Sequence, residues 1–354
     1  MNRGLGWILA IVGAVLIVAG GLVMLVVVPG MKKLPADTDT TRHYEGTLAA
    51  QLDPATFTFV RDVPIELTRH FAVVETDGDL ALVKEERTMT SGGKPIQQVV
   101  SHYAIDRSTM LASDEYADAW AKTEGFIPRE GLVLSWPMDT EKKDQTGWSD
   151  DYMSTVPLVF DGEVTHERSG MKTYLFTSKS GPRPIDPAMV AAMGLPTELP
   201  RKQLEAMVAQ ANLSPLVASM LPKLLASIPG DTVPLAYYYA YEGKYWIDPA
   251  TGIIVDTEKH EVRKAGIADE VLAETPLANL PEEQKDQARV AVSDFTYTAT
   301  DQSVDDARAD AEDAGGKIRL YGTVLPGVAV IVGAGLLVIG VISLMRKPKA
   351  TAAT

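Results

Sequence analysis

Two long uncharged apolar stretches, one near each end, constrain the fold of this chain more than any other feature. The first covers residues 4–31 and the second covers residues 320–345. At about 1.5 Å of rise per residue, a helix over the second stretch would be roughly 39 Å long, which exceeds the ~30 Å hydrocarbon core of a bilayer. We therefore expect transmembrane helices at 4–28 and 320–345, an intervening domain at 29–319 and a short basic tail at 346–354.

The first apolar stretch is longer than a cleavable signal peptide requires, because the apolar region of such a peptide has about 7 to 15 residues. We interpret it as an uncleaved signal anchor. Two spans bring both termini to the same side of the membrane, and Arg346, Lys347 and Lys349 directly follow the second span. Basic residues next to a span favour the cytoplasmic side. The sequence thus predicts a cell-membrane protein with cytoplasmic termini and an extracytoplasmic main domain.

Composition limits what the intervening domain can do. The whole chain carries a net charge of −14, and its only charges outside the middle region are the cations Arg3, Arg346, Lys347 and Lys349, so residues 29–319 carry −18. A domain this acidic is unsuited to binding nucleic acid over a broad face. The absence of cysteine excludes disulfides, thiolate catalysis and cysteine metal sites.

The middle region has the pattern of an antiparallel β-rich domain, a meander or a barrel. Alternating residues around Ile65 and Leu67, a Gly92-Gly93 turn, a hairpin over 156–178 and a β unit over 235–262 support this. Pro249 and Gly252 occupy the turn of the last unit, where turn chemistry favours them. We also expect a short helix at 114–122, a strand within 131–148, and a helix capped by Ser303 that Gly315-Gly316 weakens. The predicted fold class is an α+β membrane protein with a β-rich ectodomain, a helical insert and two terminal transmembrane helices.

The helical insert, residues 187–228, is rich in methionine and nearly free of strand signals. Flexible, polarisable methionine side chains suit apolar ligands of irregular shape. The simpler alternative is that these helices pack on the sheet or on one another. The candidate contacts for a hydrophobic ligand are Met189, Met193, Leu204, Met207, Val208, Val217, Met220 and Leu221.

Glycines recur at a seven-residue spacing in both apolar stretches. Small residues allow two membrane helices to approach closely, and a heptad spacing fits left-handed crossing. The alternative is that glycine is simply common in membrane helices. We predict that the two spans pack on each other through Gly6, Gly13, Gly20, Gly333 and Gly340.

No motif in the sequence indicates catalysis. The five histidines are scattered without metal-binding spacing, and nucleophile-elbow, phosphate-loop and dinucleotide-binding motifs are absent. A histidine that meets a serine and an aspartate in space is left open. We expect a protein that is not an enzyme and that has no cofactor and no metal.

Several strings in a fixed order, together with both spans, resemble the actinobacterial porin-A-like family, a family of envelope proteins with a domain of unknown function. That resemblance implies a channel in the cell envelope. The residues argue against a simple membrane barrel, which needs a lipid-facing apolar band and aromatic girdles. The strings are MKKLPAD at 31–37, YAIDR at 103–107, WPMDTEKK at 136–143, GMKTYLF at 170–176, YWIDPATG at 245–252 and GTVLP at 322–326.

Three functions therefore compete. The plan of two anchors around a β-rich domain with a helical cap also resembles class B scavenger receptors, in topology only. The leading hypothesis is an envelope protein whose ectodomain binds or relays a hydrophobic ligand such as envelope lipid. The alternatives are a porin-like channel and a structural or accessory component. The expected partners are the lipid bilayer and an apolar ligand, and the sequence leaves an oligomer open.

Overall fold

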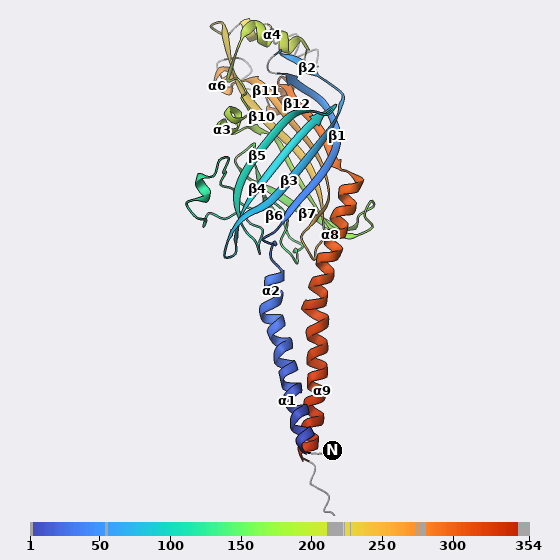
Figure 1. Ribbon diagram of the computed structural model, residues 1–354. Helices are drawn as coiled ribbons and strands as arrows, with labels where there is room; N and C mark the ends of the chain where they lie inside the picture. Colours follow the sequence, from blue (N-terminus) through green and yellow to red (C-terminus); the bar gives the residue numbers. More distant parts are fainter. Residues whose placement is uncertain are drawn as a thin grey trace, which may run out of the picture. The chain divides into compact units, whose positions relative to one another are not determined.

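The computed structural model describes residues 3–53, 56–210, 222, 224–226, 228–273, 275 and 281–345. The chain divides into two compact units. One, the helix unit, comprises Met1–Pro35 and Ala309–Thr354, and the other, the barrel unit, comprises Ala36–Arg308. Both are drawn in Figure 1.

The helix unit contains two long helices that pack against each other. Each is long and apolar enough to cross a membrane, at Gly4–Met31 and within Asp301–Met345. Each also has a π-helical turn shortly before a proline, Pro29 or Pro326, where the missing backbone N–H interrupts the regular α ladder. The segments are α1 (Arg3–Leu22), η1 (Val23–Val27), α2 (Val28–Met31), α8 (Asp301–Arg319), η4 (Leu320–Val324) and α9 (Leu325–Met345).

Two details of the last helix differ from the sequence prediction. The helix begins at Asp301, so Ser303 lies inside its first turn and does not cap it. The Ser303 hydroxyl instead accepts a hydrogen bond from the backbone N–H of His43, at 2.7 Å. The helix also continues through Gly315-Gly316 into α9 without a break, because each helical residue adds a backbone hydrogen bond that offsets the local cost of glycine.

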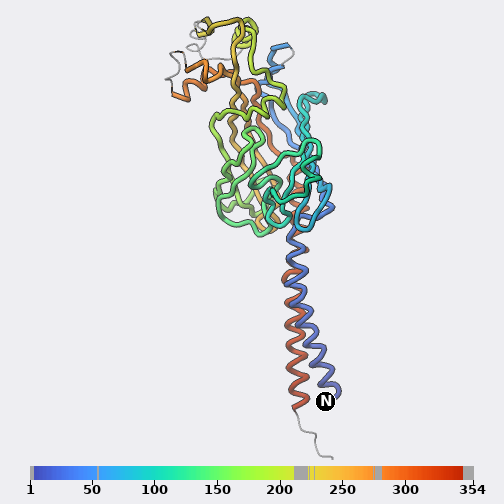
Figure 2. Tube along the Cα trace, turned by 90° about the vertical axis from the view of Figure 1, so that its left-hand side faces the viewer, coloured from blue at the N-terminus to red at the C-terminus, as the bar shows by residue number. Residues whose placement is uncertain are grey.

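The barrel unit is an antiparallel sheet of twelve strands in the order β5-β4-β3-β1-β12-β11-β10-β8-β7-β6, with β2 on β1 and β9 on β10. Figures 1 and 2 show these strands curling around a common interior. The β-rich antiparallel fold predicted from the sequence is confirmed. The strands are β1 (Asp39–Asp53), β2 (Thr58–Val60), β3 (Val63–Asp77), β4 (Leu80–Ser91), β5 (Lys94–Asp106), β6 (Gln145–Ser149), β7 (Ser154–Thr165), β8 (Lys172–Pro184), β9 (Glu198–Pro200), β10 (Thr232–Ile247), β11 (Ile254–Ile267) and β12 (Val290–Ala299).

The edge strands β5 and β6 are linked by the irregular segment 107–144. Single-residue bridges join Ile105 to Ala112, Leu111 to Leu132, and Leu132 to Gly147. The sheet is thereby closed into a barrel, which removes its open edges. Segment 107–144 makes only isolated bridges to the two edge strands and forms no continuous strand ladder with them.

Segment 107–144 also corrects two expectations. The predicted helix at 114–122 is only one 3-10 turn, η2 (Trp120–Lys122), because Trp120 is buried against Leu82 and Ala104 and fixes the segment by packing. The strand predicted before Pro137 is only an isolated bridge at Leu132, and the regular strand β6 (Gln145–Ser149) lies instead after the charged residues that were expected to form a turn.

The helical insert is less purely helical than predicted. It contains α3 (Pro187–Ala192), which Asp186 caps through the N–H of Ala188, then strand β9, then α4 (Arg201–Gln210). Strand β9 pairs with β10 and so ties the insert to the main sheet. Two further short helices, α6 (Asp269–Leu272) and α7 (Glu282–Gln287), lie between β11 and β12.

The outer surface of the barrel unit is that of a solvated protein. Among its described residues, the exposed large hydrophobic side chains are scattered, whereas the helix unit exposes them along both spans. A barrel embedded in lipid would carry a continuous apolar band on its outside. The membrane-crossing segments are therefore the two helices. The scattered residues are Val60, Val74, Ile96, Val100, Leu111 and Val159.

Candidate functional site

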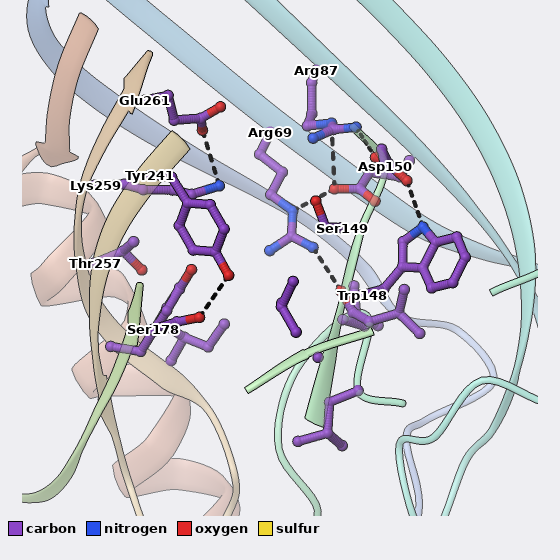
Figure 3. Close-up of a pocket in the computed structure, with 18 of the residues that line it drawn as sticks. Arg69, Arg87, Trp148, Ser149, Asp150, Ser178, Tyr241, Thr257, Lys259 and Glu261 are labelled. Atoms are coloured by element: carbon purple, nitrogen blue, oxygen red, sulfur yellow. Dashed lines mark hydrogen bonds and ion pairs between the residues drawn. The ribbon is translucent and has the colours of Figure 1, made fainter. Parts of the chain in front are cut away.

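The most distinctive site is a cavity of about 220 Å³ inside the barrel. Side chains from nine strands line it, together with the irregular segment around 129–136. Figure 3 shows Lys259 and Tyr241 entering from one wall and Arg69 from the facing wall. The charged lining residues are the cations Arg69, Arg87, Arg129, Lys259 and Arg263 and the carboxylates Glu85, Asp150, Asp151 and Glu261.

Glu85 is the centre of the first charge cluster. It projects inward from β4, and its two oxygens accept from Arg69 Nε at 2.6 Å and Arg129 Nη1 at 3.3 Å. Burial alone would raise the pKa of this carboxyl, but Arg69, Arg87 and Arg129 outweigh burial and hold the pKa well below its ordinary value. Glu85 is thus ionised at neutral pH, as a buried carboxylate can be when cations surround it.

Two neighbouring aspartates in the turn after β6 reach opposite sides of the interior. Asp150 pairs with Arg87 of β4 and with Arg129 at 3.1 Å, whereas Asp151 accepts a bidentate pair from Arg263 of β11 at 2.7 and 2.8 Å. Bidentate arginine–carboxylate pairs are directional as well as strong. This turn, at the β6 end of the sheet, is therefore connected through charge to β4 near the other end and to β11 in the middle.

Glu261 is the centre of the second cluster. It accepts from Tyr239 at 2.8 Å and Tyr297 at 3.1 Å, and it pairs with Lys259 at 3.0 Å. Burial would raise the pKa of Glu261, but Lys259 and Arg263 overcome that effect and lower it to about 2. Burial also works against the charged form of Lys259, yet Glu261 raises the pKa of Lys259 well above its ordinary value.

Aromatic side chains complete the lining. The Tyr241 hydroxyl lies 2.8 Å from Ser178 Oγ, and Trp136 packs on Phe176 and Tyr245 with centroid distances of 5.2 and 5.7 Å. The indole N–H of Trp136 and the Nε–H of Arg129 have no hydrogen-bond partner among the described residues, although both side chains are buried. The interior thus offers donors that no protein acceptor uses.

Five of the residues predicted to contact a hydrophobic ligand are described, and all five pack against one apolar cluster. Leu204 and Met207 of α4 are 4% and 1% exposed and belong to the apolar cluster at one end of the barrel interior. Met189, Met193 and Val208 are partly buried against that cluster. Val217, Met220 and Leu221 lie outside the described residues.

The five glycines predicted at the helix–helix contact lie where α1 and α9 approach. A Cβ on Gly13 would come within 2.4 Å of the Gly333 carbonyl oxygen, and one on Gly340 within 2.6 Å of the Gly6 oxygen. Gly20 lies against Pro326 in the same way, at 3.1 Å. The helix backbones therefore approach most closely at Gly13, Gly333 and Gly340, where an added Cβ would lie less than 3.0 Å from backbone atoms of the other helix.

A serine, a histidine and an aspartate do meet in space. His166 lies between Ser169 Oγ at 2.9 Å and Asp256 Oδ2 at 3.0 Å. Ser169 is buried, however, and its hydroxyl also accepts from the N–H of Met171 in the β7–β8 turn, while Arg168 shares Asp256. This arrangement ties the β7–β8 hairpin to β11, across the intervening strand β10. Within the described ranges, no His, Asp and Glu cluster could hold a metal ion.

The charged interior was missed because its residues resemble an ordinary exposed strand face. Lys259, Glu261 and Arg263 alternate along β11, but Glu258 just before them and His260 among them are polar too. A strand that is charged on both faces gives no period-two signal. The signal that could have found it is the charged alternation on β4, at Glu85 and Arg87, and on β11; β3 contributes the single charge of Arg69 among apolar residues.

The fold and site define a membrane protein with two apolar helices and a solvated β-barrel with a charged interior. A family model for porin PorA matches residues 5–342. The chain therefore belongs to the porin PorA family, as its sequence motifs predicted. A relative described as porin PorA from Corynebacterium amycolatum is 26% identical over 389 residues, which cover 96% of this chain and 98% of the relative.

Proposed function

We propose that the protein mediates passage of small hydrophilic solutes through the cell envelope and that the barrel cavity selects them. The observation that carries this proposal is the charged, tyrosine-lined cavity enclosed by the barrel strands. Polar and ionic walls fit a hydrated solute and exclude an apolar one. The porin name of the C. amycolatum relative points the same way.

The proposal places residues 36–308 outside the cell membrane, with both termini in the cytoplasm. The outward faces of α1 and α9 are apolar along their length, so one helix pair has no polar face to line a pore. Passage through the membrane then requires several copies of the chain. No step in this function calls for catalysis or a cofactor.

Planar-bilayer recordings with the purified full-length chain test this function. We expect ion conductance, with an anion-to-cation permeability ratio that falls in Lys259→Gln, because that substitution removes a cation from the cavity. The matched control is Lys244→Gln, since Lys244 is exposed on the outer face and pairs there with Glu258. No conductance from the pure chain, or equal ratios in both variants and the wild type, would contradict the proposal.

The hydrophobic-ligand hypothesis stays a prediction and is the second candidate. One observation favours it: Met189, Met193 and Val208 are only partly buried, as are Phe57 and Phe59, which pack against the same apolar cluster. Against it, Leu204 and Met207 are buried and pack against other residues of the protein, where a ligand would have to displace them. Lipid retained by non-conducting protein in native mass spectra would favour this candidate. A chain that neither conducts nor retains ligand would fit a structural or accessory component.

A further inference from the structure

We infer that the barrel cavity is a binding site for a small anion that carries a carboxylate or phosphate group. This inference rests on the proposed function and names its solute class. The anion would lie between Lys259 and Arg69, which enter from facing walls (Figure 3).

The first argument is the balance of charge inside the barrel. Five cations and four carboxylates line the cavity, so its lining carries one positive charge in excess. This excess lies within a region whose total charge is −18. A net charge enclosed by protein is costly unless an opposite charge compensates it. An anion supplies that compensation.

The second argument is which cations are free to accept a further partner. Every lining carboxylate already pairs with a cation: Glu85 with Arg69 and Arg129, Asp150 with Arg87 and Arg129, Asp151 with Arg263, and Glu261 with Lys259 and Arg263.

Arg69 and Lys259 each share their single carboxylate with another cation. Their side chains are both 21% exposed, whereas Arg129 is 3% and Arg263 is 12% exposed. Arg87 is more exposed, at 43%, but it pairs with two carboxylates, Glu85 and Asp150. The incompletely compensated charge is therefore accessible at Arg69 and Lys259.

The third argument is the surplus of hydrogen-bond donors. Trp136 and Arg129 both line the cavity, and their Nε1 and Nε atoms are buried donors that lack an acceptor among the described residues. Both groups can only donate. Buried donors without acceptors are unfavourable, and a carboxylate or phosphate brings several acceptor oxygens with negative charge. The excess positive charge of the lining and its donors without acceptors therefore both favour an anion with several acceptor oxygens.

The cavity volume limits the size of the anion. At about 30 Å³ per water, 220 Å³ corresponds to roughly seven water molecules. Inorganic phosphate and acetate fit within this volume with room for water beside them.

The test uses purified full-length protein in detergent, in a low-chloride buffer, titrated with inorganic phosphate and separately with acetate. Trp136 and Trp148 line the cavity, so intrinsic tryptophan fluorescence reports occupancy directly. Glucose serves as the uncharged control. We expect a saturable fluorescence change with either anion and none with glucose.

Two variants locate the site. Lys259→Gln should weaken binding at least tenfold, and Glu261 keeps Arg263, Tyr239 and Tyr297 as partners, so the fold is retained. Trp136→Phe keeps the aromatic packing but removes one donor, and its affinity, measured by calorimetry, should fall several-fold. Lys244→Gln, on the outer face, should bind as the wild type does.

The outcomes separate this inference from the proposed function. No saturable response to either anion, or binding that is unchanged in Lys259→Gln, overturns the anion site even if the protein conducts. Cavity-dependent anion binding by a protein that does not conduct supports the site and refutes the porin function.

Discussion

Within the barrel, buried carboxylates stabilise the structure because each pairs with several cations at once. Glu85 and Glu261 are each almost fully buried and each face more than one positive charge. Replacing a whole buried ion cluster with apolar residues can be neutral, whereas removing one partner leaves an uncompensated charge that costs about 3 to 5 kcal/mol. Single substitutions at these residues should therefore be far more harmful than their number of hydrogen bonds suggests.

Acid should destabilise the protein through Glu261. Its pKa is about 2 in the folded protein against an ordinary value of 4.5, so its pairing stabilises the fold fully above pH 4.5 and is lost as the pH falls toward 2. The contribution of this residue is on the order of 3 kcal/mol. Thermal unfolding followed by circular dichroism between pH 7 and pH 2.5 measures it.

In that experiment Glu261→Gln should unfold at a lower temperature at pH 7, with a smaller further loss on acidification. Glu258→Gln is the control, because Glu258 lies on the same strand but is exposed and pairs with Lys244 on the outer face. Equal pH dependence in the wild type and Glu261→Gln would show that Glu261 is not the group responsible.

At the scale of elements, one turn joins the irregular segment to the sheet. Gly252 ends the Asp248–Gly252 turn between β10 and β11 and adopts a left-handed φ of 73°. Its carbonyl accepts from Ser135 Oγ and from the N–H of Trp136, and a Cβ at this position would lie 2.0 Å from the Trp136 carbonyl oxygen. The turn is thus both a hairpin connection and the docking point for Trp136.

Gly252→Ala should destabilise the protein by more than roughly 3 kcal/mol, because backbone strain adds to displacement of the Trp136 backbone. Gly92→Ala is the matched control: its φ is 56°, but no atom lies within 4 Å of the added Cβ. Strain alone should cost about 1 to 2 kcal/mol there. Urea unfolding of the two variants compares them, and similar losses would refute a docking role for Gly252.

At the scale of the whole molecule, the proposed topology is directly testable because the chain contains no cysteine. Lys179→Cys would place one thiol on the outer face of the barrel unit, where that side chain is 71% exposed. Gly4→Cys would place one at the start of α1, with no neighbouring atom within 4 Å. In intact cells, a membrane-impermeant maleimide should label Lys179→Cys, and it should label Gly4→Cys only after lysis. The reverse pattern would contradict cytoplasmic termini.

Much of the architecture follows from local patterns. Hairpin turns such as Asp248–Gly252, alternation on the strands and the apolar ends indicate a two-span protein with a β-rich domain, since each signal depends only on nearby residues. Segment 107–144 could not be predicted in this way. Its conformation is set by bridges to β5 and β6 and by burial of Trp120, and these contacts lie far away in the sequence.

The sequence by itself determined the two apolar helices, the strand-rich domain between them and membership in the porin PorA family. The length of an apolar stretch and the period of its residues are local properties of the sequence. Motifs in a fixed order can likewise be recognised without knowledge of tertiary contacts. Only the tertiary structure decided that the sheet closes and that Arg69, Glu85, Lys259 and Glu261 face one cavity. The sequence of a strand does not show which of its charged side chains face inward. Closure of the barrel buries the inward-facing ones, and buried charges require partners of opposite charge.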